Sequence, residues 1–156
     1  MRLLVISDTH GMRPGIIKVL RRHEDIKHVA FLGDMLPDIA NIPEMRDRTL
    51  YAVRGNCDFG GEEPTSLFIE LEGKKIFMCH GHEYNVKWTY DKAINAACVR
   101  GADLLLFGHT HTPIIDYING LHIVNPGSLG SPRDGNPSYA IVDISEKGIL
   151  PTHMKL

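Results

Sequence analysis

The stretch Leu104-Leu105-Leu106-Phe107-Gly108-His109-Thr110-His111 joins four consecutive apolar residues to two histidines that are one residue apart. A short apolar run of this kind is typical of a strand that is buried on both faces. The histidines then lie on the loop at the carboxyl end of the strand, which is where open α/β sheets bind their ligands. The sequence therefore predicts a ligand or metal site on this loop.

Four further expected strands end in short motifs that contain Asp, Asn or His. In chain order these motifs are Asp8-Thr9-His10-Gly11, Gly33-Asp34, Gly55-Asn56-Cys57-Asp58 and His80-Gly81-His82. Strand ends at one edge of a sheet lie close together, so we expect their side chains to converge with the histidine pair. The seven residues expected to meet as metal ligands are Asp8, His10, Asp34, Asn56, His80, His109 and His111.

The first half of the chain alternates expected strands with expected helices, which favours a parallel sheet. Residues 14–22 predict a helix because their apolar residues share one face and a proline stands at the start. Residues 37–46 predict a short helix or loop, and the Gly- and Pro-rich residues 59–65 predict a loop. The strands of this half are expected at 2–7, 28–32 and 50–53.

The second half favours antiparallel pairs. Hairpins are expected within 66–79, 114–124 and 138–154, and the middle one turns at Asn119-Gly120, a strong hairpin signal. A helix is expected over 87–100, before the strand 103–107. Antiparallel pairs need a partner layer that buries one face, so the pattern predicts a two-sheet sandwich with helices outside, in a single domain of residues 1–156.

The composition is that of an ordinary soluble domain. The 156 residues are 43% hydrophobic and 23% charged, with a formal net charge of −2. This charge balance argues against nucleic acid or an anionic membrane surface as a partner. We find no apolar run long enough for a membrane span and no signal peptide pattern. The three cysteines are Cys57, Cys79 and Cys98, and no two of them have the CxxC spacing. Reduced thiols in the cytoplasm are therefore the expected state.

The expected ligands mix two kinds of donor. Aspartate and asparagine oxygens suit hard cations, whereas imidazole suits transition metals. Seven ligands are too many for one tetrahedral ion, but they fit two ions about 3.5–4 Å apart, as in two-metal hydrolases. A carboxylate is the natural bridge between two such ions because its oxygens can bind both.

The five motifs, in this order, resemble those of the calcineurin-like metallophosphoesterases. The short chain, Cys57 in its motif and the stretch Asn125-Pro126-Gly127-Ser128 narrow the resemblance to the small prokaryotic YfcE-type phosphodiesterases. The resemblance extends over nearly the whole chain, from Asp8 to Ser128. It implies a four-layer αββα sandwich of two mixed sheets, with a dinuclear metal site at one edge.

The resemblance also implies a ligand set for each of two divalent metal ions. Asp8, His10 and His111 would bind the first ion, Asn56, His80 and His109 would bind the second, and Asp34 would bridge them. A hydroxide between the ions would then attack the phosphorus of a phosphoric diester, so that no protein nucleophile is needed. Mn²⁺ is the expected ion, with Ni²⁺, Fe, Co²⁺ or Zn²⁺ as alternatives, because ligand types alone do not choose among these metals.

The chain departs from the family pattern at Cys57. Much of the superfamily has a histidine here, in the role of protonating the leaving group, and a thiol is a weaker acid than imidazole. His82 or a water could take this role instead, and Asp58 could orient a ligand or a water. The expected catalytic residues are therefore Asn56, Cys57, Asp58 and His82.

Two other functions remain open. A phosphomonoesterase that acts on a nucleotide would use the same ligands. A non-catalytic, protein-binding scaffold would resemble the retromer subunit of this fold, although ligand-competent residues at all seven positions favour catalysis. The expected partner is a small-molecule phosphoester, and exposed apolar faces on the hairpins could support a homodimer or a higher homo-oligomer.

Several other polar residues stand near the motifs. Asn125 and Ser128 are expected to shape the rim of the site, and Arg133 is either a phosphate ligand or an ordinary loop arginine. The remaining histidines are expected to be ordinary surface or core residues. They are His23, His28, His122 and His153.

Overall fold

Two mixed sheets, each built around three parallel strands, form the centre of the molecule. The computed structural model describes residues 1–156. In the first sheet the strand order is β10-β9-β1-β2-β3, and in the second it is β4-β5-β6-β8-β7. The parallel strands are β1 (Arg2–Ile6), β2 (His28–Phe31) and β3 (Thr49–Ala52) in the first sheet, and β5 (Lys74–Cys79), β6 (Leu104–Phe107) and β8 (Leu121–Pro126) in the second. The antiparallel strands are β4 (Ser66–Leu71), β7 (Pro113–Ile118), β9 (Ser138–Ser145) and β10 (Gly148–Lys155).

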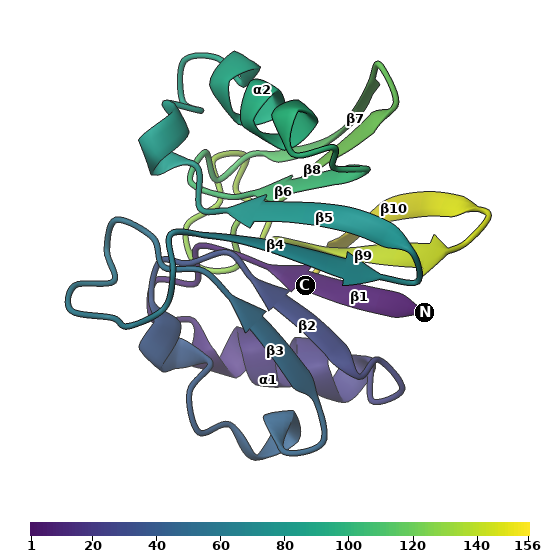
Figure 1. The fold of residues 1–156 in the computed structure, drawn as a ribbon. Helices are drawn as coiled ribbons and strands as arrows, with labels where there is room; N and C mark the ends of the chain where they lie inside the picture. The colour runs from purple at the N-terminus through teal and green to yellow at the C-terminus, as the bar shows by residue number, and fades with distance from the viewer.

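One helix covers the outer face of each sheet. Helix α1 (Arg13–Arg22) packs on the first sheet and α2 (Asp91–Val99) packs on the second, at opposite ends of the stack of layers (Figure 1). The expected four-layer αββα sandwich of two mixed sheets is therefore confirmed. Three short 3-10 helices complete the chain: η1 (Leu36–Asp38), η2 (Pro43–Met45) and η3 (His82–Tyr84). None of the helices has the length and apolar character needed to span a bilayer.

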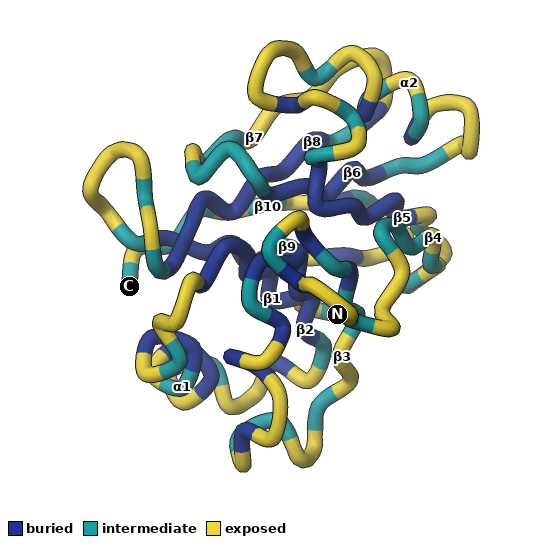
Figure 2. The backbone as a smooth tube through the Cα atoms, turned by 90° about the vertical axis from the view of Figure 1, so that its left-hand side faces the viewer, coloured by how far each residue is buried: buried dark blue, intermediate teal, exposed yellow.

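The apolar runs of the sequence are the strands at the centre of this stack. In β6, Leu104 and Leu106 face the core between the two sheets, whereas Leu105 and Phe107 face the core beneath α2. All four side chains are fully buried. Because successive side chains of a strand point to opposite faces, a strand between two layers needs apolar residues at every position. Figure 2 shows the buried strands at the centre of the backbone trace.

The predicted strands agree with the structure to within two residues at each end, but the prediction of the second helix was wrong at its start. The helix was expected from residue 87 and begins at Asp91. The chain first forms η3, and Asn85 then adopts a left-handed φ of 55°, which a regular helix does not contain. Trp88 is 90% exposed, so this turn also lacks a buried face that would hold it in a helix.

The C-terminal hairpin extends the first sheet rather than the second. Strand β9 pairs antiparallel with β1, with Leu3 opposite Val142, and β10 follows as the edge strand. The hairpin therefore returns to the first strand of the chain. The two other hairpins belong to the second sheet, where Asn119 and Gly120 both have the positive φ of a type I′ turn.

We expect Leu106→Ala to lower the free energy of unfolding by about 2–5 kcal/mol, because it leaves a cavity between the sheets. The measurement is urea unfolding followed by circular dichroism. Leu150→Ala is the matched control, since Leu150 is 65% exposed. Equal unfolding midpoints for the two variants would contradict the assignment of Leu106 to the central core.

Candidate metal centre

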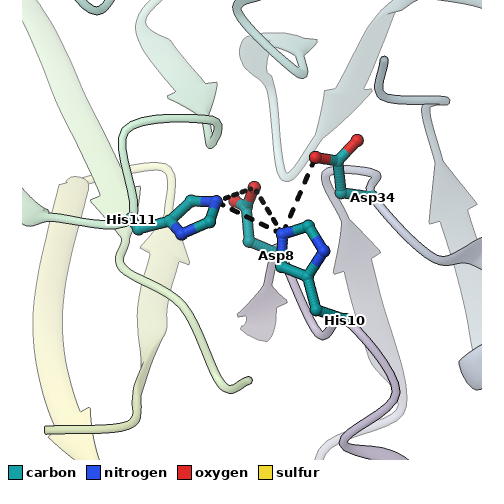
Figure 3. A group of neighbouring side chains, drawn as sticks. All are labelled: Asp8, His10, Asp34 and His111. Atoms are coloured by element: carbon teal, nitrogen blue, oxygen red, sulfur yellow. Dashed lines mark hydrogen bonds and ion pairs between the residues drawn. The ribbon is translucent and has the colours of Figure 1, made fainter. Parts of the chain in front are cut away.

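Six polar side chains meet at the edge of the sandwich where the parallel strands of both sheets have their carboxyl ends. They form two groups in which the potential ligand atoms all lie within 4.8 Å of one another. The first group, drawn in Figure 3, points inward from three different loops. Its members are Asp8, His10, Asp34 and His111, and the members of the second group are Asp34, His80 and His109.

Asp34 belongs to both groups because its two carboxylate oxygens face different histidines. Oδ1 lies 3.4 Å from Nε2 of His80, and Oδ2 lies 3.8 Å from Nε2 of His10. The backbone N–H of Cys57 donates to Oδ1 at 2.9 Å. Burial tends to raise the pKa of Asp34, but the contact with His80 and this N–H outweigh it and hold the pKa far below its usual value. The carboxylate is therefore charged, and it stands between the two groups.

Asp8 has one satisfied oxygen and one unsatisfied oxygen. Oδ2 accepts the hydroxyl of Ser7 and the backbone N–H of His109, the latter at 3.0 Å. Oδ1 is buried and has no hydrogen-bond partner, although Nε2 of His111 lies 3.1 Å away. A buried carboxylate oxygen without a partner costs about 1–3 kcal/mol. This position therefore favours positive charge, either a proton on His111 or a metal ion.

For two of the four histidines, a backbone carbonyl determines which ring nitrogen points into the cluster. Nδ1 of His80 donates to the carbonyl of Leu32, and Nδ1 of His111 donates to the carbonyl of Ser131, both at 2.7 Å. A carbonyl only accepts, so in the neutral rings Nδ1 carries the hydrogen and Nε2 presents a lone pair to the carboxylates. This arrangement is the usual one for histidines that bind metals.

Ring nitrogens of the cluster also lie close to one another. Nε2 of His80 lies 3.1 Å from Nδ1 of His109, and Nε2 of His10 lies 3.3 Å from Nε2 of His111. Carboxylate oxygens and imidazole nitrogens this close repel each other unless protons or metal ions lie between them. The donor set of oxygen and imidazole nitrogen fits divalent transition metals.

The same contacts shift the pKa values of the histidines. Burial lowers the pKa of His80, but the nearby carboxylates of Asp34 and Asp8 outweigh it and raise the pKa above its usual value. The contact with Asp8 likewise raises the pKa of His111. Burial and the charge on His80 lower the pKa of His109 to about 4. Positive charge is therefore favoured at this site, next to a ring that stays neutral.

Five of the six cluster residues have a left-handed backbone conformation. Such a φ costs a residue other than glycine about 1–3 kcal/mol and is common at functional sites. The surrounding loops must hold each of these residues in place against this cost. The φ values are 53° at Asp8, 42° at His10, 60° at Asp34, 67° at His109 and 59° at His111.

Asp58, which was expected among the catalytic residues as a group that orients a ligand or a water, binds the backbone of the loops around the cluster. Its carboxylate accepts four backbone N–H groups, those of Asp34, Met35, Leu36 and Gly55, at 2.7–2.9 Å. Both oxygens are therefore used, and neither is free for a substrate. Asp58 joins the loop after β2 to the loop after β3, so it is a positioning residue for Asp34.

Three further positioning residues hold the other loops. Asp38 accepts the hydroxyl of Thr9 and the N–H of Gly11, and no motif of the sequence marked it. Asn125 donates to the carbonyl of Gly108, and Ser128 donates to the carbonyl of Asp8 at 2.6 Å. Asn125 and Ser128 are fully buried, so they act on the site by holding the loops that carry its ligands and do not face solvent themselves.

Gly108 lets the loop after β6 approach the loop after β1. A Cβ at this position would overlap Oγ of Ser7 and would lie 2.7 Å from Oδ2 of Asp8. Only glycine therefore fits between β6 and the buried carboxylate. The glycine before the histidine pair is needed for this close approach of two loops.

The remaining predicted site residues lie around the cluster. Asn56 is exposed, and its amide nitrogen contacts Sγ of Cys57 at 3.4 Å and makes no hydrogen bond to the cluster. Burial and the charge of Asp34 raise the pKa of Cys57 to about 11, so its thiol stays protonated. The ring of His82 lies 5.4 Å from that of His80, and its Nδ1 is buried without a partner. Burial and His80 lower the pKa of His82.

The other basic candidates have structural contacts. Arg133 is exposed, and its backbone N–H donates to the carbonyl of His111 at 3.2 Å. None of the four remaining histidines belongs to the cluster, as expected. His23 contacts the hydroxyl of Tyr139, and His153 contacts the carbonyl of Asn125.

Comparisons with known proteins agree with this geometry. The family model described as the calcineurin-like phosphoesterase superfamily domain matches residues 1–147. The probable metallophosphoesterase YsnB of Bacillus subtilis (strain 168) is 32% identical over 146 residues, which cover 92% of this chain and 85% of that protein. The phosphodiesterase YfcE of Escherichia coli (strain K12) is 29% identical over 168 residues, which cover 92% of this chain and 88% of that protein.

A solved structure has the same fold over the whole chain. The crystal structure of a predicted phosphoesterase from Streptococcus pneumoniae TIGR4 superposes with a TM-score of 0.79 and 26% identity, covering 99% of this chain and 97% of that one. The order of motifs, the four-layer sandwich and the family match thus agree over almost all of the sequence. The chain belongs to the calcineurin-like phosphoesterase superfamily.

Proposed function

We propose that this protein is a metal-dependent phosphodiesterase that hydrolyses small phosphoric diesters with two divalent metal ions. The observation that carries the proposal is the position of Asp34, whose two oxygens face two separate histidine groups. The unsatisfied buried oxygen of Asp8 supports it, because a cation there would relieve a cost that the polypeptide leaves unmet. The relatives named phosphodiesterase and metallophosphoesterase favour the same chemistry.

The ligand assignment rests on the two groups and, for Asn56, on the resemblance of its motif to those of the family. Two bound ions would act as Lewis acids toward the phosphoryl oxygens and would lower the pKa of a water to near neutrality. Asp8, His10 and His111 would hold one ion, His80 and His109 would hold the other with Asn56, and Asp34 would be common to both. Mn²⁺ is the ion we expect, as the donor set allows it.

The residues around the ligands would position the substrate and its protons. The thiol of Cys57 stays protonated and is a weak acid. Burial and the charge of His80 lower the pKa of His82, which disfavours the protonated ring that could donate a proton. Neither residue is a strong proton donor to a leaving oxygen. The leaving group must therefore depart with little help from an acid of this chain.

Asp34→Asn is expected to reduce bound Mn²⁺ from two ions to one or none per chain and to lower diesterase activity by about 100-fold or more, because a bridging charge is lost. Mass spectrometry of metals in the dialysed protein and a steady-state assay test this. Asp116→Asn, an exposed aspartate on β7, is the matched control. Full metal content in Asp34→Asn would overturn the assignment of the bridge.

Asp58→Asn is expected to weaken Mn²⁺ binding by about 10- to 100-fold without changing the number of ions bound, because it loosens the loop that carries Asp34. The same change replaces the charged acceptor of four backbone N–H groups by an amide and should lower the free energy of unfolding by about 1–3 kcal/mol. Calorimetric Mn²⁺ titration and urea unfolding measure the two effects. Loss of one ion with unchanged stability would make Asp58 a ligand instead.

The rate of hydrolysis is expected to depend steeply on the leaving group. Aryl phosphodiesters should be cleaved much faster than alkyl phosphodiesters, since Cys57 is a poor acid. A series of diesters with leaving groups of increasing pKa measures this as the slope of log kcat/KM. A slope of zero would defeat the prediction.

Two alternative functions have distinct outcomes in the same assays. A phosphomonoesterase would cleave an aryl monoester faster than the matching diester. A protein-binding scaffold would bind no transition metal at micromolar concentration and would cleave neither ester. The proposal requires bound metal and preferential cleavage of the diester.

A further inference from the structure

A pocket of about 500 Å³ adjoins the candidate metal centre. One wall is the segment Met35–Ala40, which begins directly after Asp34. The other wall is the loop Cys57–Glu63, which follows β3 and projects from the edge of the sheet (Figure 1). Both walls begin beside Asp34, since Met35 follows it in the chain and the backbone N–H of Cys57 donates to its carboxylate, so the pocket lies next to the cluster.

Two arginines hold the walls of this pocket from outside. The guanidinium of Arg13 donates to the carbonyls of Pro37, Asp38, Ala40 and Asn41 at 2.9–3.2 Å. Nη1 of Arg54 donates to the carbonyl of Gly61 at 3.2 Å. Both walls are therefore tied to the body of the protein by bonds to their backbones, so the pocket is present without a ligand. A preformed concave site costs less to fill than a flexible one.

The lining of the pocket is apolar except for two acidic residues. Asp58 and Glu63 are the charged residues of the lining, and neither Lys nor Arg is among them. The carboxylate of Asp58 is fully occupied by backbone N–H groups, so the exposed Glu63 supplies the free charge. An anionic group in the pocket would meet the charge of Glu63, and no Lys or Arg side chain of the lining would offset it. The apolar lining consists of Met35, Leu36, Pro37, Ala40 and Phe59.

Phe59 gives the pocket an open aromatic wall. Its side chain is 92% exposed, although phenylalanine is usually buried. An exposed aromatic ring beside a preformed apolar pocket is typical of a site that a flat apolar group covers when it binds. The pocket is also far larger than a methyl ester requires.

We propose that this pocket binds one neutral, aromatic or apolar ester group of the phosphodiester and so determines which diesters the protein prefers. The inference rests on the proposed function, because it places the phosphoryl group at the cluster and the organic group between residues 35–40 and 57–63. It also predicts discrimination against diesters whose second ester group carries a negative charge.

The experiment compares three diesters that share p-nitrophenol as the leaving group. Their second ester group is methyl, phenyl or 4-carboxyphenyl, so the group that departs is constant while the group offered to the pocket changes. For the wild-type protein with Mn²⁺, kcat/KM for the phenyl ester should exceed that for the methyl ester by about 10-fold or more. The 4-carboxyphenyl ester should be poorer than the phenyl ester.

Three variants test the pocket at exposed positions, where folding does not depend on the side chain. Phe59→Ala should lower the phenyl-to-methyl ratio of kcat/KM by about 2- to 10-fold, the range of one aromatic contact. Ala40→Phe fills the pocket and should lower the ratio by about 10-fold. Glu63→Lys should raise kcat/KM for the 4-carboxyphenyl ester relative to the phenyl ester. Trp88→Ala, which removes an equally exposed aromatic residue outside the pocket, should leave the ratios unchanged.

The outcomes separate the pocket from the proposed function. If the wild-type protein with Mn²⁺ releases nitrophenol from none of the diesters, the proposed function fails. If the methyl and phenyl esters are cleaved with equal kcat/KM, or if Phe59→Ala and Ala40→Phe both leave the ratio unchanged, the pocket proposal is overturned while the diesterase activity stands. A change in the ratio with Trp88→Ala equal to that with Phe59→Ala would also overturn it.

Discussion

The crowding of carboxylate oxygens and imidazole nitrogens from Asp8, Asp34 and four histidines is the constraint on which the site depends. These atoms lie 3.1–4.0 Å apart, so they repel one another unless protons or metal ions lie between them. A polypeptide holds such an arrangement only when other bonds prevent it from relaxing. Here the backbone carbonyls of Leu32 and Ser131 fix two of the rings.

The sandwich supplies the rigidity that this arrangement requires. Three apolar cores, one between the sheets and one beneath each helix, hold the parallel strands in place, and the ends of four of them, β1, β2, β5 and β6, carry the cluster. The loops between them have left-handed residues at five cluster positions, and this strain is tolerated because packing and loop contacts determine the backbone. The stability of the core and the geometry of the site are thus linked through the strand ends.

Acidic residues of the same type have opposite roles in this molecule. Asp8 and Asp34 each keep at least one oxygen turned toward the cluster, whereas Asp58 and Asp38 use their carboxylates to bind backbone N–H groups of the same loops. The second pair keeps the first in place. Negative charge is thereby concentrated at one point of the sheet edge. The neighbouring pocket is mainly apolar, and Glu63 is the acidic residue of its lining whose charge is not bound by backbone N–H groups.

The sequence by itself determined the layers and the residues that could form a site. Fully apolar runs such as Leu104–Phe107 require layers on both faces, and the motifs at strand ends identified six side chains that the structure brings together. Only the tertiary structure decided that β9 joins β1, that α2 starts at Asp91, and that Asp58 faces backbone whereas Asp34 faces histidines. The periodicity of apolar residues indicates which faces of a strand or helix are buried. Which strands pair, and where a polar side chain points, depends on contacts between residues far apart in the chain.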